Sequence, residues 1–235
     1  MRTILKTALG STALAMMALP AAAQAAQVFT ANLTPSSGMA TFTLDGTMLD
    51  VNVQASGLDD GMHLAHLHGL FTAGGAPANS TLPTIADDGD GDGFVELGEA
   101  APKYGNIILN MNSIGAGATI DYMQSFDLTD PNNFGFVNGD ASMGRYDVDD
   151  LIGAMGDQFT TRELIVHGQD ATAVGAGTAG EVDGTAGFKV LLPTLGGEVT
   201  SAVPEPATWL MLLGGFGAIG GTIRSRKRRE KLAFA

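Results

Sequence analysis

The chain has 235 residues, and 45% of them are hydrophobic, which is enough for one domain with a sizeable core. Its formal net charge is −13. Without residues 1–25 and 203–235, which have the character of targeting segments, four basic and 23 acidic side chains remain, a net charge of −19. Such a domain attracts cations and repels nucleic acid and anionic lipid, so nucleic-acid binding is excluded.

Residues 1–25 have the three parts of a secretory signal peptide. Two basic residues open the chain, an apolar run follows over residues 7–19, and the sequence Ala-Gln-Ala ends at Ala25. The apolar run is too short for a permanent membrane helix. We therefore expect export and cleavage by signal peptidase after Ala25. Cleavage after Ala23 and an uncleaved N-terminal anchor are the alternatives.

The central part of the chain is dominated by short segments in which apolar and polar residues alternate, as in half-buried strands. Residues 40–44 and 49–53 alternate in this way around a glycine turn, which predicts a hairpin. Further strands are expected at 28–34, 63–68, 106–111, 119–127, 162–166 and 187–192, and one short helix at 148–155. Seven or eight strands with one minor helix favour an all-β fold, an antiparallel sandwich or barrel.

Residues 88–99 match the twelve-residue calcium loop of an EF-hand, with a glycine at the sharp turn in position 6. The predicted ligands are the carboxylates of Asp88, Asp90, Asp92, Glu96 (through water) and Glu99, and the carbonyl oxygen of Phe94. Two prolines in residues 76–86 exclude an entering helix. We therefore expect one structural calcium loop inserted in the β domain; a solvated turn without calcium is the alternative. The chain has no cysteine, so bound metal is the obvious clamp in place of disulfides.

The chain has four histidines: His63, His66 and His68 lie close together, and His167 lies far downstream. Alternation along a strand places His66 and His68 on one face, about 7 Å apart at their roots. His167 joins them only if its own strand lies alongside. Three imidazoles bind copper or zinc. The alternative is a structural role, in which the histidines form hydrogen bonds across strands and hold loops.

These motifs carry a family resemblance. Residues 57–69, which include the run GMHLAHLHG, resemble the CHRD domain motif. More distantly, and together with residues 164–167, they resemble the copper half of Cu,Zn superoxide dismutase. The resemblance implies a Greek-key, superoxide dismutase-like domain over residues 26–196. A short spacer is expected over residues 197–202.

The same resemblance assigns roles to the histidines. It maps the copper ligands to His66, His68 and His167, and a structural histidine to His63. The bridging histidine of the dismutases, their other zinc histidines and their disulfide have no counterpart, because the chain has no further histidine and no cysteine. The acidic loop lies where the zinc loop of that family would run, so calcium replaces zinc as the organiser of the loop in this interpretation.

The C-terminal segment, residues 203–230, contains Pro204, Glu205 and Pro206, then a mostly apolar stretch over 207–223 and a cluster of basic residues. Seventeen helical residues span about 26 Å, barely enough to cross a hydrocarbon core. The segment closely resembles the PEP-CTERM sorting signal. That resemblance implies a Gram-negative bacterium that makes exopolysaccharide, an inner-membrane-anchored precursor, and cleavage by an exosortase near the Pro-Glu-Pro sequence. A simple membrane anchor is the alternative.

Together these features predict an exported, calcium-stabilised protein of the cell surface or extracellular matrix. We favour a structural or binding role without enzymatic activity, with extracellular polysaccharide as a candidate partner. The alternative is a copper-binding oxidoreductase of superoxide dismutase type that uses the three-histidine site. Sequence motifs typical of hydrolases are absent.

Overall fold

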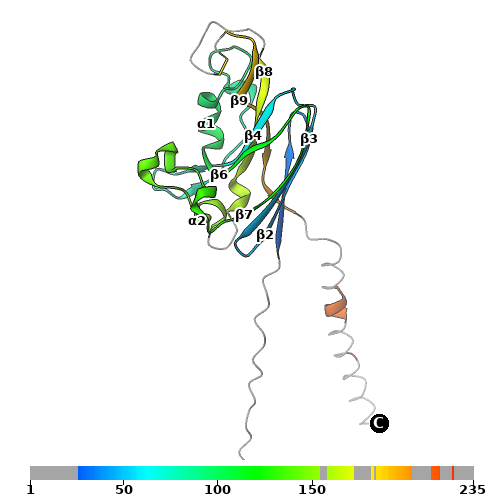
Figure 1. Cartoon of the computed structure of the whole chain (residues 1–235). Helices are drawn as coiled ribbons and strands as arrows, with labels where there is room; N and C mark the ends of the chain where they lie inside the picture. The colour runs from blue at the N-terminus through cyan, green and yellow to red at the C-terminus, as the bar shows by residue number, and fades with distance from the viewer. Residues whose placement is uncertain are drawn as a thin grey trace, which may run out of the picture.

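The computed structural model of the chain describes residues 26–153, 158–171, 181–182, 184–202, 213–217 and 224. Strands dominate this part of the chain and form two antiparallel sheets that face each other (Figure 1). The all-β expectation is therefore confirmed. The predicted signal peptide, the sorting residues Pro204, Glu205 and Pro206, and most of the predicted membrane span 207–223 lie outside the described residues. Within the described residues, no helix is long and apolar enough to cross a membrane.

The first sheet has five strands in the order β10, β1, β2, β3, β7. Their bounds are Thr200–Ser201, Gln27–Leu33, Ser37–Asp45, Met48–Ser56 and Thr119–Asp127. The predicted hairpin is present as β2 and β3, with Leu44 opposite Leu49 and Gly46 at a positive φ of 61° in the turn. Alternate side chains of β1 to β3 are buried, as the sequence pattern predicts for strands with one face on a core.

The second sheet contains β4 (Met62–Phe71) with β6 (Asn106–Ala116) and β8 (Glu163–Ala171) as its antiparallel neighbours. Next to β8 lies β9 (Gly187–Glu198), and the short β5 (Pro77–Ala78) pairs with the end of β4. The pairing of β4 with β8 places Leu64 opposite His167 and His66 opposite Ile165. The strand that carries the downstream histidine therefore lies directly beside the strand that carries the other three.

The core lies between the two sheets. Phe159 packs edge-to-face against Phe29 and Phe42, with ring centroids 4.9 and 5.3 Å apart. On β4 and β8, Leu67 and Val166 point into this core and are fully buried. Because successive side chains of a strand point to opposite faces, the neighbouring histidines point to the outer face of the second sheet. The predicted choice of faces on these two strands is confirmed.

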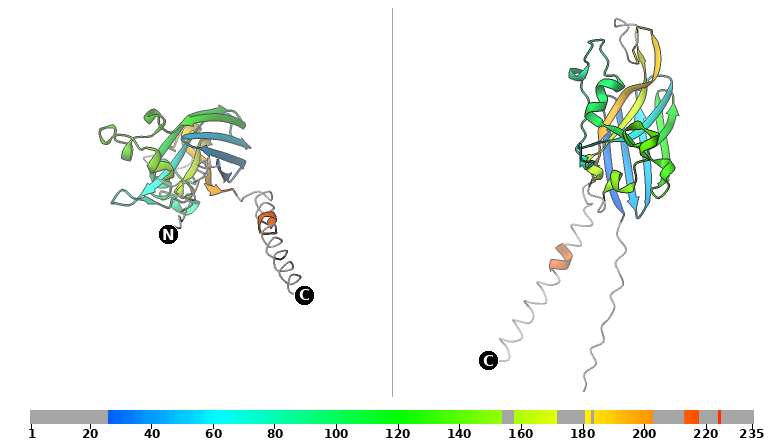
Figure 2. Two further views of the ribbon diagram at one scale, coloured as in Figure 1. Left: turned by 90° about the horizontal axis from the view of Figure 1, so that it is seen from below. Right: turned by 90° about the vertical axis from the view of Figure 1, so that its left-hand side faces the viewer.

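The β domain contains two α-helices within its described residues, α1 (Leu97–Tyr104) and α2 (Val148–Ile152), and residues 213–217 are also helical. The expectation of one short helix is wrong, because α1 follows the acidic loop directly. The predicted helix 148–155 corresponds to α2, which ends at Gly153 with a φ of 71°; residues 154–155 are outside the described part. Helix α1 lies against the outer face of the second sheet (Figures 1 and 2), where Ala100 and Tyr104 pack on Ile165.

Residues 197–202 are not a spacer. Strand β9 continues to Glu198, and β10 pairs with β1, with Ser201 opposite Phe29. Val199, between the two strands, is fully buried in the core, and the Thr200 hydroxyl donates to the carbonyl oxygen of Thr30 at 3.1 Å. Burial of Val199 and the main-chain pairing therefore make this segment the last part of the domain.

Candidate functional site

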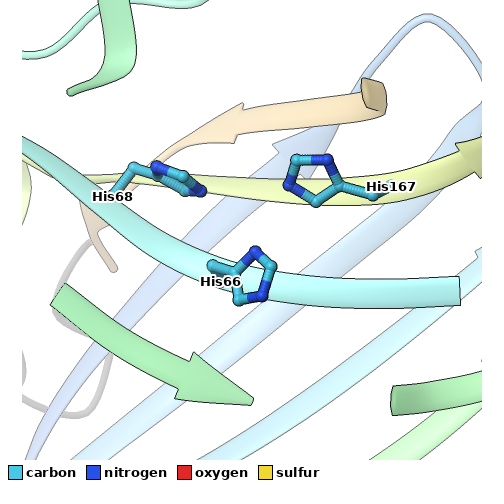
Figure 3. Close-up of side chains that lie close together, drawn as sticks. All are labelled: His66, His68 and His167. Atoms are coloured by element: carbon cyan, nitrogen blue, oxygen red, sulfur yellow. The ribbon is translucent and has the colours of Figure 1, made fainter. Parts of the chain in front are cut away.

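The three histidines that the sequence analysis grouped together meet on the outer face of the second sheet. His66 and His68 come from β4 and His167 comes from β8, and one ring nitrogen from each lies within 4.8 Å of the others. The rings gather at one place (Figure 3), and each residue is at most 9% exposed. Three imidazoles this close match the donor set that copper and zinc sites use.

Hydrogen bonds to main-chain carbonyl oxygens orient two of the rings. Nδ1 of His68 lies 3.0 Å from the carbonyl oxygen of Gly105, and Nδ1 of His167 lies 2.7 Å from that of Leu191. A carbonyl oxygen only accepts, so each Nδ1 carries the proton and each Nε2 presents a lone pair. Both Nε2 atoms are buried and have no hydrogen-bond partner in the described part of the chain. Histidine ligands of metals show this arrangement, in which the distal nitrogen is held by a carbonyl.

The environment favours the neutral form of all three rings. Burial, and then the nearby His167, lower the pKa of His66 to about 3. Burial likewise lowers the pKa of His68 and of His167. A ligating imidazole must be unprotonated, and these rings meet that requirement at neutral pH. Nδ1 of His66 is also buried without a hydrogen-bond partner among the described residues.

His63 is separate from this group, on the opposite face of β4. Its Nδ1 lies 3.2 Å from the carbonyl oxygen of His167, and its Nε2 lies 3.1 Å from that of Asp59. Its ring also contacts Phe188, with ring centroids 5.9 Å apart. His63 therefore connects β4 with β8 and with the loop before β4.

Helix α1 packs against the three-histidine group at His68. The ring of Tyr104 lies 4.4 Å from that of His68, centroid to centroid, and Tyr104 is 1% exposed. Burial, and then the charge of Glu181, raise the pKa of Tyr104, whose hydroxyl finds no hydrogen-bond partner within the described residues. Tyr104 was not predicted as a site residue, because no helix was expected at this place. The calcium-loop pattern was the available signal, since position 12 of an EF-hand loop normally opens the exiting helix.

Glu163 is a second buried polar residue that the sequence analysis missed. It lies opposite His68 in the pairing of β4 with β8 and is 1% exposed. Burial, and then the charge of Glu198, raise the pKa of Glu163 to about 8, and its Oε2 atom has no partner among the residues described. A carboxyl in such surroundings is protonated at neutral pH. Its position beside His68 depends on strand register, which no local motif indicates.

The acidic loop brings its predicted side chains together. Carboxylate oxygens of Asp88, Asp90 and Glu99 lie within 4.8 Å of one another, and so do those of Asp90, Asp92 and Glu96. The two groups share Asp90. Main-chain N–H groups inside the loop hold the carboxylates: Gly91 donates to Asp88 at 2.7 Å, and the Phe94 N–H donates to Asp92 at 2.8 Å. The loop therefore gathers its carboxylates in two overlapping groups of three.

Two of these carboxylates are in surroundings that penalise negative charge. Asp92 is 8% exposed, and its Oδ2 atom has no hydrogen-bond partner in the part of the chain described. Burial and the neighbouring carboxylates raise the pKa of Asp92, and the same causes raise that of Glu96. Glu96 accepts a hydrogen bond from the main-chain N–H of Val182, and Glu181 accepts one from Leu97 at 2.9 Å. Segment 181–182 is thereby fastened to the loop.

Comparison with known proteins identifies the C-terminal end. The PEP-CTERM protein-sorting motif matches residues 202–229. No curated protein matches the chain. The motif makes this an exported protein that is anchored in a membrane before an exosortase processes it. The match covers the sorting segment and leaves the β domain to be interpreted from its own residues.

Proposed function

We propose that the chain is an exported, calcium-stabilised protein of the cell surface or extracellular matrix of a Gram-negative, exopolysaccharide-producing bacterium. In this proposal its β domain is Greek-key and superoxide dismutase-like and holds one copper ion on His66, His68 and His167. One observation carries the copper site: three buried imidazoles converge within 4.8 Å, and in two of them a carbonyl oxygen holds the distal nitrogen. The sorting motif carries the export and the membrane-anchored precursor.

The chemistry of the donors favours copper. The site offers neutral nitrogen ligands, and the chain has no cysteine that would add a thiolate. Among divalent first-row metals, such ligands bind Cu²⁺ most tightly, ahead of Zn²⁺. When bound, copper supplies one-electron chemistry or a tight, inert centre. The residues of this chain hold the rings in place and keep them unprotonated.

The copper site is tested by metal analysis of the full chain after loading with Cu²⁺ and removal of free metal. We expect one copper per chain, and loss of that copper in His66→Ala and His167→Ala. His63→Gln is the matched control, because His63 lies on the other face of β4 and is expected to leave the copper content unchanged. Equal copper in all three variants, or none in the wild type, would refute the site.

The calcium loop is proposed to be a structural clamp. The observation that favours a cation there is the buried Oδ2 atom of Asp92, which lacks a hydrogen-bond partner among the described residues and lies in a group of converging carboxylates. Calcium would neutralise these charges, since carboxylate and carbonyl oxygens are its usual ligands. Extracellular modules of this kind bind calcium with dissociation constants on the order of 10⁻⁴–10⁻³ M. Calcium is expected to raise the melting temperature of the domain.

A second candidate function is a copper oxidoreductase of superoxide dismutase type. It is favoured by a cavity that His68 lines, because a reactive metal must be reached by its substrate. The missing bridging histidine and the net charge of −19 weigh against turnover of an anion. The rate of superoxide removal by the copper-loaded chain separates the two candidates. Catalytic removal that disappears in His66→Ala favours the oxidoreductase, whereas stoichiometric copper without removal favours the binding protein.

A further inference from the structure

A cavity of about 530 Å³ lies between α1, β6 and the segment 131–145. His68 and Tyr104 line one side of it, and asparagines, aromatic rings and Arg145 line the others. Binding sites for small organic molecules commonly have volumes of about 300–1,000 Å³. A diatomic substrate such as superoxide would fill only a small part of this volume. The size of the cavity fits a ligand of about monosaccharide size instead.

The lining of this cavity differs in charge from the rest of the domain. The domain has 23 acidic and four basic side chains, yet no aspartate or glutamate lines the cavity, and one of the four basic residues, Arg145, does. Such a lining favours an anionic group and disfavours a cation. The cavity is therefore a local exception on a strongly acidic protein.

Neighbouring groups hold the side chain of Arg145 in a position to bind an anionic group. Its guanidinium lies 4.1 Å from the centre of the Phe136 ring and donates one hydrogen bond to the carbonyl oxygen of Phe134. No ion pair joins Arg145 to a carboxylate in the described part of the chain, where Lys103 and Asp87 form the one salt bridge. A guanidinium has five N–H donors in a fixed plane, which suits a carboxylate ligand. Arg145 is thus oriented by neutral neighbours.

Asparagine side chains provide the other polar groups of the cavity: Asn106, Asn110, Asn112 and Asn132. Register shifts in the pairing of β4 with β6 place Asn110 opposite His66, on the face of the sheet that carries the histidines. Nδ2 of Asn106 donates to Asn138, which leaves its carbonyl oxygen as an acceptor in the cavity wall. Oδ1 of Asn110 accepts from the main-chain N–H of Asn112, and Nδ2 of Asn132 donates to Asp130. Nδ2 of Asn110 is left as a donor and Oδ1 of Asn132 as an acceptor for the hydroxyl groups of a sugar. The partly exposed ring of Phe136 adds an apolar surface.

From these observations we propose that the cavity binds a hydroxylated organic acid of monosaccharide size, with uronic acids as the ligand class. The carboxylate pairs with Arg145, the hydroxyl groups bond to the asparagine amides, and the ring lies between Phe136 and the side that His68 lines. The proposal depends on the cavity alone and requires no metal on the histidines. It gives the surface protein a means to recognise acidic polysaccharide.

The test is a titration of the full chain, in calcium and without copper, with glucuronate, glucose, glucosamine and acetate, followed by NMR. We expect saturable binding of glucuronate, at least 10-fold weaker binding of glucose, and no binding of glucosamine or acetate. Raising the salt concentration should weaken the binding of glucuronate and leave that of glucose unchanged, because only glucuronate carries a charge. This comparison needs no variant and so does not depend on whether a variant folds.

Substitutions then locate the binding. Arg145→Gln should remove the preference for glucuronate over glucose, and Arg145→Lys should keep part of it. Lys189→Gln is the matched control, since Lys189 is a basic residue that does not line the cavity, and it should bind like the wild type. Glucose and glucuronate binding equally, no saturable binding of either, or an unchanged preference in Arg145→Gln would overturn the proposal. None of these results bears on the copper content of the protein.

Discussion

Nδ1 of His68 lies 3.0 Å from the carbonyl oxygen of Gly105, the residue that caps the C-terminal end of α1. The first turn of the same helix contains Glu99, which is position 12 of the calcium loop. Glu99 accepts hydrogen bonds from the N–H groups of Gly89, at 2.6 Å, and of Glu96, at 3.0 Å. One helix of eight residues therefore joins the acidic loop to a side chain of the three-histidine site.

This connection predicts that calcium strengthens copper binding. Without calcium, the carboxylates of the loop repel one another, and α1 loses the anchor that holds Gly105 against His68. Coupling between two sites is typically worth about 1–3 kcal/mol, so we expect copper affinity to fall about 5-fold or more in calcium-free buffer. The measurement is competition with a coloured copper chelator, with and without calcium. By reciprocity, copper should raise calcium affinity by the same factor. Equal copper affinity in both buffers would show that the two sites are independent.

The buried carboxylate of Asp92 predicts that its substitution shifts the melting temperature in opposite directions with and without calcium. In calcium-free protein its charge is unfavourable, because burial raises its pKa and one oxygen has no partner in the described region. Asp92→Asn should therefore raise the melting temperature without calcium and lower it with calcium, when a ligand is lost. Asp140→Asn is a suitable control, since Asp140 is an exposed turn residue whose side chain accepts from Ser142. A loss of stability in both conditions would mean that Asp92 has a purely structural role.

Substitution of Gly105 by alanine is expected to destabilise the domain. Gly105 has a φ of 81°, and a Cβ atom there would overlap the carbonyl oxygen of Gly69 on β4. Gly144 has nearly the same backbone conformation as Gly105 (φ 85°, ψ −165°) but open space around it, so Gly144→Ala measures the backbone strain alone, about 1–3 kcal/mol. We expect Gly105→Ala to cost at least about 2 kcal/mol more, which lowers the melting temperature by a further 4–8 °C or so. Similar melting temperatures for the two variants would contradict the close contact of α1 with β4.

Glu163 predicts a pH dependence. Its pKa is raised to about 8, so between roughly pH 4.5 and 8 the folded state holds a proton that the unfolded state has released. The contribution to stability is full below about pH 4.5 and is lost as the pH rises through 8. Glu163→Gln, which is neutral at every pH, should therefore gain stability relative to the wild type between pH 5 and pH 9, on the order of a few kcal/mol.

Urea unfolding of the metal-free protein at the two pH values measures this difference. Glu198→Gln serves as the control, because Glu198 is an exposed neighbour and contributes only the smaller, Coulombic part of the shift. If the free energies of unfolding of Glu163→Gln and the wild type differ by the same amount at pH 5 and pH 9, Glu163 is ionised in the folded state.

Local patterns in the sequence were sufficient for much of the fold. Alternation along the strands predicted which faces of β4 and β8 carry the histidines, because the side chains of a strand have a period of two. The glycine turn at Gly46 predicted the hairpin. The expected spacer was wrong because Val199, with glycines before it and polar residues after it, has no local pattern. Only its burial against the other sheet shows that it belongs to the domain.

The histidine site was predictable only in part, since its assembly depends on contacts between distant segments. That His167 lies opposite Leu64 is a matter of strand register, which no motif of either strand determines. Helix α1 contains Gly98 and Pro102, two poor helix formers, so its sequence does not predict a helix. Its packing against the second sheet stabilises the helix instead. Asn110 reaches the histidine face because β6 is bulged, which breaks the alternation that the sequence analysis relied on.

The most direct test of the account is the electron paramagnetic resonance spectrum of the full chain loaded with one equivalent of Cu²⁺. The three-histidine site predicts a single copper signal with hyperfine coupling to three imidazole nitrogens. In His167→Ala the coupling should fall to two nitrogens or the signal should be lost, and His63→Gln should give the wild-type spectrum. A spectrum dominated by oxygen ligands, or one that changes equally in both variants, would contradict the site.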